Sequence, residues 1–199
     1  MKDAFFLRDF TPGDFSSAAE IARQAWGDEG GFLPPALLSR IYGYLVRYYY
    51  VPDSPFSLAV THEGRLCAFL LAAAGEHETS AADCWIEAQL AEEERKVFQS
   101  YKAYLDGNSH AAEQAKLPGE VCLLLFAGIK KGSGSLLMAE FERRCRKRNI
   151  TSMLLWTDDT CDFQWYQRRN FTEAARFPAN PSLPGRNLTT LIFRKEIQR

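Results

Sequence analysis

The stretch from 120 to 148 constrains the fold of this chain more than any other. An apolar run from Val121 to Ala127 leads into a loop that carries Gly132 and Gly134, and an amphipathic segment follows the loop. The apolar residues of that segment share one face of a helix; they are Leu137, Met138, Phe141 and Cys145. The stretch therefore predicts a buried strand, a glycine loop and a helix in succession, which is typical of mixed α and β folds.

The loop has features of an anion-binding site. Gly132 and Gly134 let the backbone approach a ligand closely, and the start of the following helix offers unpaired N–H groups at the positive end of its dipole. Lys130 and Lys131 add positive charge. No GK[ST] sequence closes the loop and no third glycine follows, which excludes a Walker loop and a dinucleotide-binding fingerprint. A phosphate site and an ordinary turn that uses glycine for its geometry both remain open.

Hydrophobic periodicity predicts the remaining elements. We expect strands at 4–10, 57–61, 66–74, 120–127, 151–156, 171–177 and 188–195. We expect helices at about 15–26, 34–48, 132–148 and 162–169.

The segment from about 76 to 117 differs in composition, being rich in Ala, Glu, Gln and Lys. It predicts a helical insertion after the third strand, with an interrupted helix at about 81–106 and a second at 109–116. Asp106-Gly107-Asn108 is a strong turn sequence and is expected to separate the two. Such an insertion could form a wall of the substrate site or a dimer surface.

Length and charge limit the function classes. A chain of 199 residues that is 46% hydrophobic can bury one sizeable core, so we expect one domain over 1–199. The 24 Lys and Arg residues balance 25 Asp and Glu residues, which argues against nucleic-acid and membrane-surface partners. No apolar run approaches the ~20 residues that span a bilayer, and the apolar start of the chain is short for a secretory signal. We expect a cytoplasmic protein.

Cysteine and histidine usage gives no sign of a disulfide framework or a metal site. The five cysteines are odd in number and form no CxxC pair, and the three histidines lie far apart in the sequence. We therefore expect no bound metal.

Two short motifs in this chain resemble the GNAT superfamily of acyl-CoA-dependent N-acetyltransferases. The loop from Ile129 to Gly134 matches the family pattern [QR]xxGx[GA] at both glycines, with Ile129 in place of the polar first residue. Farther on, Tyr166 and Phe171 match a Y-x-x-x-G-F pattern, with Asn170 in place of glycine. Asn also accepts the left-handed conformation of a helix end.

The resemblance implies an α+β (α/β) fold with a mostly antiparallel sheet of about seven strands, flanking helices and the insertion. It also implies that acetyl-CoA is the acyl donor and that the glycine loop holds its pyrophosphate. The cofactor-binding residues implied in this way are Leu125, Phe126, Ala127, Ile129, Lys130, Lys131, Gly132, Ser133, Gly134 and Ser135.

The activity implied is acetyl transfer to a primary amine of a small molecule or peptide, by direct attack on the thioester. Strand 125–127 is expected to splay from strand 151–156 and to offer a backbone N–H to the oxyanion. Tyr166 would be the general acid for the departing thiolate, although a half-buried structural aromatic is the alternative. Glu120 is the first candidate for the general base. The other base candidates are Glu76, His77 and Glu78, and a solvated charge at a strand end is the alternative for all four residues.

Several alternatives stay open at this level. Asp158 and Asp159 could bind the acceptor amine or cap the short helix, and Thr160 is another cap candidate. Cys161 has no nearby histidine in the sequence and is expected to be structural. A non-catalytic acyl-CoA-binding module remains the rival to an enzyme, and Ile129 is its best support. A homodimer is compatible with the sequence.

Overall fold

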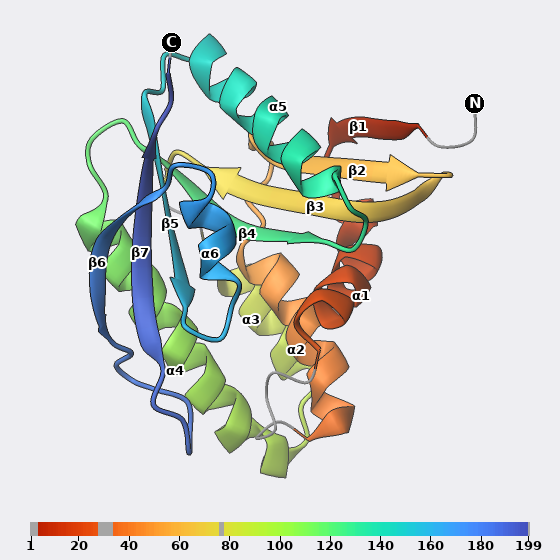
Figure 1. Cartoon of the computed structure of the whole chain (residues 1–199). Helices are drawn as coiled ribbons and strands as arrows, with labels where there is room; N and C mark the ends of the chain where they lie inside the picture. The colour runs from red at the N-terminus through yellow and green to blue at the C-terminus, as the bar shows by residue number, and fades with distance from the viewer. Residues whose placement is uncertain (1–3, 28–33, 76–77, 199) are drawn as a thin grey trace.

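The computed structural model describes residues 4–27, 34–75 and 78–198, and it is built on one mixed sheet (Figure 1). The strands run in the order β1-β2-β3-β4-β5-β7-β6, and the pair β4–β5 is parallel while every other pair is antiparallel. The strands are β1 (Phe5–Asp9), β2 (Leu58–His62), β3 (Arg65–Ala73), β4 (Val121–Gly128), β5 (Ser152–Asp158), β6 (Thr172–Pro178) and β7 (Thr189–Glu196). This confirms the expected α+β class and its seven strands.

Helices cover both faces of the sheet (Figure 1). On one face, α5 packs against β2, β3 and β4; on the other, α1 packs against β3 and β4, and α4 packs against β5 and β7. The helices are α1 (Phe15–Trp26), which follows the short 3-10 turn η1 (Pro12–Asp14), α2 (Pro35–Tyr48), α3 (Ser80–Glu87), α4 (Glu92–Ala115), α5 (Ser133–Lys147) and α6 (Phe163–Gln167). None of the described helices combines the length and the apolarity needed to cross a membrane.

The patterns read from the sequence explain the central elements. Cys67 to Ala73 in β3 are all buried, as expected for a strand covered on both faces. The predicted stripe of α5 is likewise buried, and Phe141 and Cys145 are fully enclosed. Cations gather at the end of α5, where they interact favourably with the helix dipole.

The prediction of a turn at residues 106–108 is wrong, because α4 runs through them without a break. The buried Asn108 side chain donates to the Tyr104 carbonyl and bonds the Thr190 hydroxyl of β7. Gly107 is needed for space: a Cβ there would lie 2.8 Å from the Asn180 carbonyl oxygen. Tertiary contacts thus override a local turn preference, and the chain is interrupted between α3 and α4 instead.

The sheet opens between its two parallel strands. β4 and β5 pair at Val121–Met153 and Cys122–Leu154 and then separate. The step in register against β3 leaves Leu124 of β4 without an opposite residue, which marks a bulge. From 123 to 128, β4 therefore presents backbone groups with no β5 partner, as the predicted splay requires.

Candidate functional site

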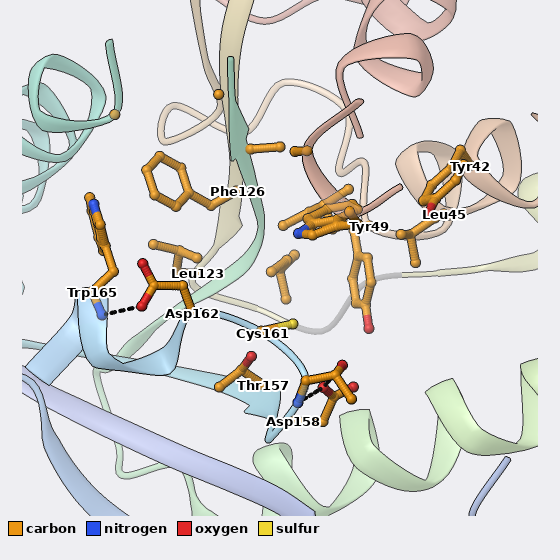
Figure 2. Close-up of a pocket in the computed structure, with 18 of the residues that line it drawn as sticks. Tyr42, Leu45, Tyr49, Leu123, Phe126, Thr157, Asp158, Cys161, Asp162 and Trp165 are labelled. Atoms are coloured by element: carbon orange, nitrogen blue, oxygen red, sulfur yellow. Dashed lines mark hydrogen bonds between the residues drawn. The ribbon is translucent and has the colours of Figure 1, made fainter. Parts of the chain in front are cut away.

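A cavity of about 740 Å³ fills the opening between β4 and β5. It is lined from both faces of the sheet. Phe126 and Trp165 lie on one side of β4, while Tyr42, Leu45 and Tyr49 lie on the other (Figure 2). The cavity is therefore a passage through the sheet with two differently lined ends.

One end of the cavity is the glycine loop. Gly132 precedes α5 with φ of 93°, a left-handed conformation that favours glycine. The Ser133 side chain donates to the Lys130 carbonyl at 2.7 Å and closes the loop. The first helical bond runs from the Leu136 N–H to the Gly132 carbonyl, so the N–H groups of the residues just before Leu136 have no acceptor within the helix. Gly134 and Ser135 line the cavity, so their N–H groups are suited to bind an anion there.

The side chains around the loop fit an anion. Lys130 and Lys131 are exposed, line the cavity, and form no ion pair within the described part of the chain. Gly134 lies so close to Phe126 that an added Cβ would come within 3.0 Å of its ring. Ile129 also lines the cavity, but it is 44% exposed and supplies no polar group.

Arg169 is a cavity residue that the sequence reasoning missed. Its guanidinium stacks 3.6 Å over the Trp165 ring and donates to the Ser135 hydroxyl at 2.9 Å. Arg169 follows α6, and this contact places its positive charge beside the start of α5. It can take the place of the polar side chain that the motif has at the position of Ile129. Arg169 and Ser135 are 34 positions apart in the sequence, so no local motif reveals their contact.

Tyr166 lines the same cavity from α6. Its ring packs against Trp165, Phe171 and Phe193. Within the described residues, its hydroxyl makes no hydrogen bond to the protein. Burial, followed by the nearby Cys161 and Asp162, raises the pKa of this phenol above its ordinary value, so it is protonated at neutral pH.

Glu120 does not line the cavity, and its proposed role as general base is not supported. Its buried carboxylate accepts bonds from Arg194 Nε at 2.7 Å and from the Leu117 N–H at 2.7 Å. Burial would raise the pKa of Glu120, but the Arg194 guanidinium and this N–H outweigh it and lower the pKa below its ordinary value. Glu120 is thus a structural tie between β4 and β7. Glu78 is exposed, and Glu76 and His77 lie outside the described residues.

The acidic run after β5 divides into separate roles. Asp158 lines the cavity, accepts the Tyr104 hydroxyl at 2.6 Å, and accepts the Thr160 N–H at 2.9 Å. Asp159 accepts the Thr189 N–H and ties β5 to β7. The cap of α6 is Asp162, which accepts the Trp165 N–H. Asp158 is therefore the acid of this group that remains a candidate for binding the acceptor.

Cys161 lines the cavity, and the described residues contain no cluster of three or more His, Cys, Asp or Glu side chains that could hold a metal ion.

Comparison with known proteins identifies the fold. No family model matches the chain, and no curated protein matches it. Among solved structures, a GNAT-family protein from Desulfovibrio desulfuricans matches with a TM-score of 0.59 at 14% identity over 98% of this chain and all of the other. The ribosomal-protein-S18-alanine N-acetyltransferase from Escherichia coli matches with a TM-score of 0.53 at 13% identity over 98% and 96%.

A third match is the C-terminal condensation domain of Ebony in complex with β-alanyl-dopamine. Its TM-score is 0.68 at 11% identity, over 98% of this chain and 99% of that domain. At such low identities the likeness concerns the fold, and the chain has the fold of the GNAT acetyltransferases.

Proposed function

We propose that this chain, which has the GNAT fold, is an N-acetyltransferase that moves an acetyl group from acetyl-CoA to a primary amine by direct attack. One observation carries the proposal: the glycine loop and Tyr166, whose hydroxyl has no hydrogen bond to the described residues, line a single cavity where β4 and β5 separate. As part of the same proposal, the protein acts in the cytoplasm and needs no metal ion.

The residues around the loop fit the diphosphate of acyl-CoA. Free N–H groups at the start of α5 are suited to phosphate oxygens, and three cations surround them. Those cations are Lys130, Lys131 and Arg169. The unpaired edge of β4 from 123 to 128 then runs from the loop toward the interior of the cavity, where an extended pantetheine arm would pair with it.

The chemistry follows from what faces the thioester. The nitrogen of a neutral amine forms a bond to the thioester carbonyl carbon, and the carbon–sulfur bond breaks. An N–H of the β4 edge stabilises the oxyanion as it develops. The Tyr166 hydroxyl gives its proton to the departing sulfur, and the nitrogen loses a proton, which restores the phenol through solvent. Because its pKa is raised, this phenol is a proton donor throughout the neutral range.

Two measurements on the full chain test the proposal. Calorimetric titration with CoA should show saturable binding, and mixing with acetyl-CoA and a panel of amines should release thiol. Absence of CoA binding would contradict the donor site. Binding without thiol release from any amine would support the rival, a non-catalytic acyl-CoA-binding module, which the apolar Ile129 favours.

A further inference from the structure

We propose that the acceptor is a monoamine with a flat aromatic body, and that its ammonium group is held by Asp158. This inference rests on the proposed function, because it concerns the end of the cavity that lies away from the glycine loop. Two observations support it: the aromatic side chains that line that end of the cavity, and the few charged side chains beside them.

The aromatic compartment is the part of the cavity lined by rings from α1, α2, α4 and β5. It consists of Trp26, Tyr42, Tyr49, Tyr101, Tyr104 and Trp156. Aliphatic residues such as Leu38, Leu45 and Leu188 fill the space between these rings. Stacked and edge-to-face contacts with such walls favour a flat apolar ligand over a sugar or an extended polar chain.

Three of the four tyrosine hydroxyl groups in the compartment already bond to the protein. Tyr42 donates to the Gly27 carbonyl at 2.6 Å, Tyr49 bonds the Ser109 hydroxyl at 3.3 Å, and Tyr104 donates to Asp158. The compartment therefore offers ring surface rather than hydrogen-bonding groups, which disfavours a polyhydroxylated acceptor.

The charged side chains in the described cavity lining favour an acceptor that carries one positive charge. Among the described lining residues, the carboxylates are Asp158 and Asp162. Asp162 is taken, since it caps α6 and pairs with Arg168 at 3.3 Å. Arg186, on the loop between β6 and β7, adds a positive charge to the lining and has no carboxylate partner in the described chain. A polyamine or an aminoglycoside would thus bring several cations to a cavity whose described lining offers one available carboxylate and adds a guanidinium.

Asp158 stands where the two substrates would meet. It is half-buried at the end of β5, and Cys161 lies between it and the Asp162–Trp165 side of the cavity (Figure 2). The Tyr104 hydroxyl, the Thr160 N–H and the Thr160 hydroxyl donate to the carboxylate, which fixes it and leaves about one lone pair for a further donor. An ammonium bound there would place its nitrogen at the opening between β4 and β5, and it gives one proton to solvent before the neutral amine attacks the thioester.

The test compares amines on the full chain. Thiol release from acetyl-CoA is measured with 2-phenylethylamine, spermidine, kanamycin and a short peptide with a free amino terminus. We expect kcat/KM for 2-phenylethylamine to exceed that of each other amine by at least about tenfold. A higher value for spermidine, kanamycin or the peptide would overturn the inference and leave the proposed function intact. Absence of CoA binding would contradict the proposed function itself.

If CoA binds and no amine releases thiol, tryptophan fluorescence still decides the inference. Trp26 and Trp156 line the compartment, so 2-phenylethylamine should change the emission of the CoA-bound protein in a saturable way. A saturable change with 2-phenylethylamine and none with spermidine supports the inference. A saturable change with spermidine and none with 2-phenylethylamine overturns the inference, and so does the absence of any change with either amine.

Variants locate the ammonium site. In Asp158→Asn, the KM for 2-phenylethylamine should rise by at least about tenfold while the KM for acetyl-CoA stays unchanged, because a charge-assisted hydrogen bond is lost. Asp159→Asn is the matched control, since Asp159 faces Thr189 and not the cavity. Equal KM values in Asp158→Asn and wild type would overturn the assignment. Should Asp158→Asn fail to fold, a fluorescence titration of the wild type with the uncharged analogue 2-phenylethanol replaces it. Equal affinity for the alcohol and the amine would overturn the assignment.

Discussion

The Tyr104 hydroxyl donates a 2.6 Å hydrogen bond to the Asp158 carboxylate and thereby joins the middle of α4 to the end of β5. The Tyr104 ring also meets Trp156 edge to face, with centroids 5.9 Å apart. Burial first, and then the charge of Asp158, raises the pKa of this phenol, so it stays a donor at neutral pH. A helix from the segment between β3 and β4 thus becomes part of the cavity wall.

Tyr104→Phe keeps the ring and removes this bond. Leaving the Asp158 oxygen without its donor should lower the free energy of unfolding by about 1 kcal/mol, and the less fixed carboxylate should raise the KM for the amine. Urea unfolding and steady-state kinetics measure both effects. Tyr50→Phe, at a tyrosine outside the cavity lining, is the control. An unchanged KM would mean that the bond only supports the fold.

Tyr166→Phe tests the general acid. The ring contacts with Phe171 and Phe193 survive, so CoA affinity and melting temperature should stay close to those of the wild type. Loss of the proton donor should reduce kcat about 100-fold or more. Thiol-release kinetics and CoA calorimetry separate the two quantities. A kcat within twofold of wild type would leave Tyr166 as a structural aromatic.

Gly134→Ala tests the glycine loop. The added methyl group would meet the Phe126 ring at 3.0 Å, so the ring or the start of α5 must shift by a few tenths of an ångström. We expect CoA affinity to fall by about tenfold or more, the loss expected when a charge-assisted backbone bond is weakened. Gly75→Ala is the control, because nothing lies within 4 Å of a Cβ at that position. Equal weakening by both variants would point to a general loss of stability.

Arg169→Gln tests the cation that the sequence motifs do not show. Removing the guanidinium from the Ser135 side of the loop should weaken CoA binding by about tenfold and make it less dependent on salt concentration. Arg168→Gln is the control matched in residue type, since the neighbouring Arg168 pairs with Asp162 and does not line the cavity. Calorimetry at two salt concentrations checks this, and identical salt dependence in both variants would contradict it.

Glu120→Gln should affect stability and not catalysis. The substitution leaves Arg194 without its buried partner, which should lower the free energy of unfolding by about 3 kcal/mol at neutral pH. Since folding lowers the pKa of Glu120, its contribution is complete above the ordinary glutamate pKa and is lost as the pH falls through the folded value. Unfolding curves of wild type and variant should therefore approach each other as the pH falls below the ordinary glutamate pKa of about 4.3. A large fall in kcat would reinstate Glu120 as a base.

Local patterns predicted the strands and most helices because burial of apolar faces decides them. The splay followed from the motifs alone, and the register of β4 and β5 confirms it. The failures arose where distant contacts decide. Asn108 is held inside α4 by Thr190, and Glu120 is bound by Arg194, 74 positions away. Neither partner is visible in a local window of sequence.

The cavity was predictable at its loop end and not at its other end. Gly132 and Gly134 belong to the predicted glycine loop, which lines one end, whereas the aromatic compartment is assembled from four elements that periodicity describes only as core helices and a strand. Arg186 belongs to a loop whose Pro and Asn content predicts no contact at all. Such residues become site residues only through the fold.

The early parting of β4 and β5 has a kinetic consequence. The cavity between β4 and β5 is lined from both faces of the sheet, so acetyl-CoA and the amine can enter from different sides. Both can therefore be bound at the same time. We expect initial-rate plots at varied acetyl-CoA and amine to intersect, the pattern of a ternary complex, and product inhibition to show no compulsory order. Parallel lines would instead indicate an acetylated enzyme, with Cys161 as the first thiol to examine.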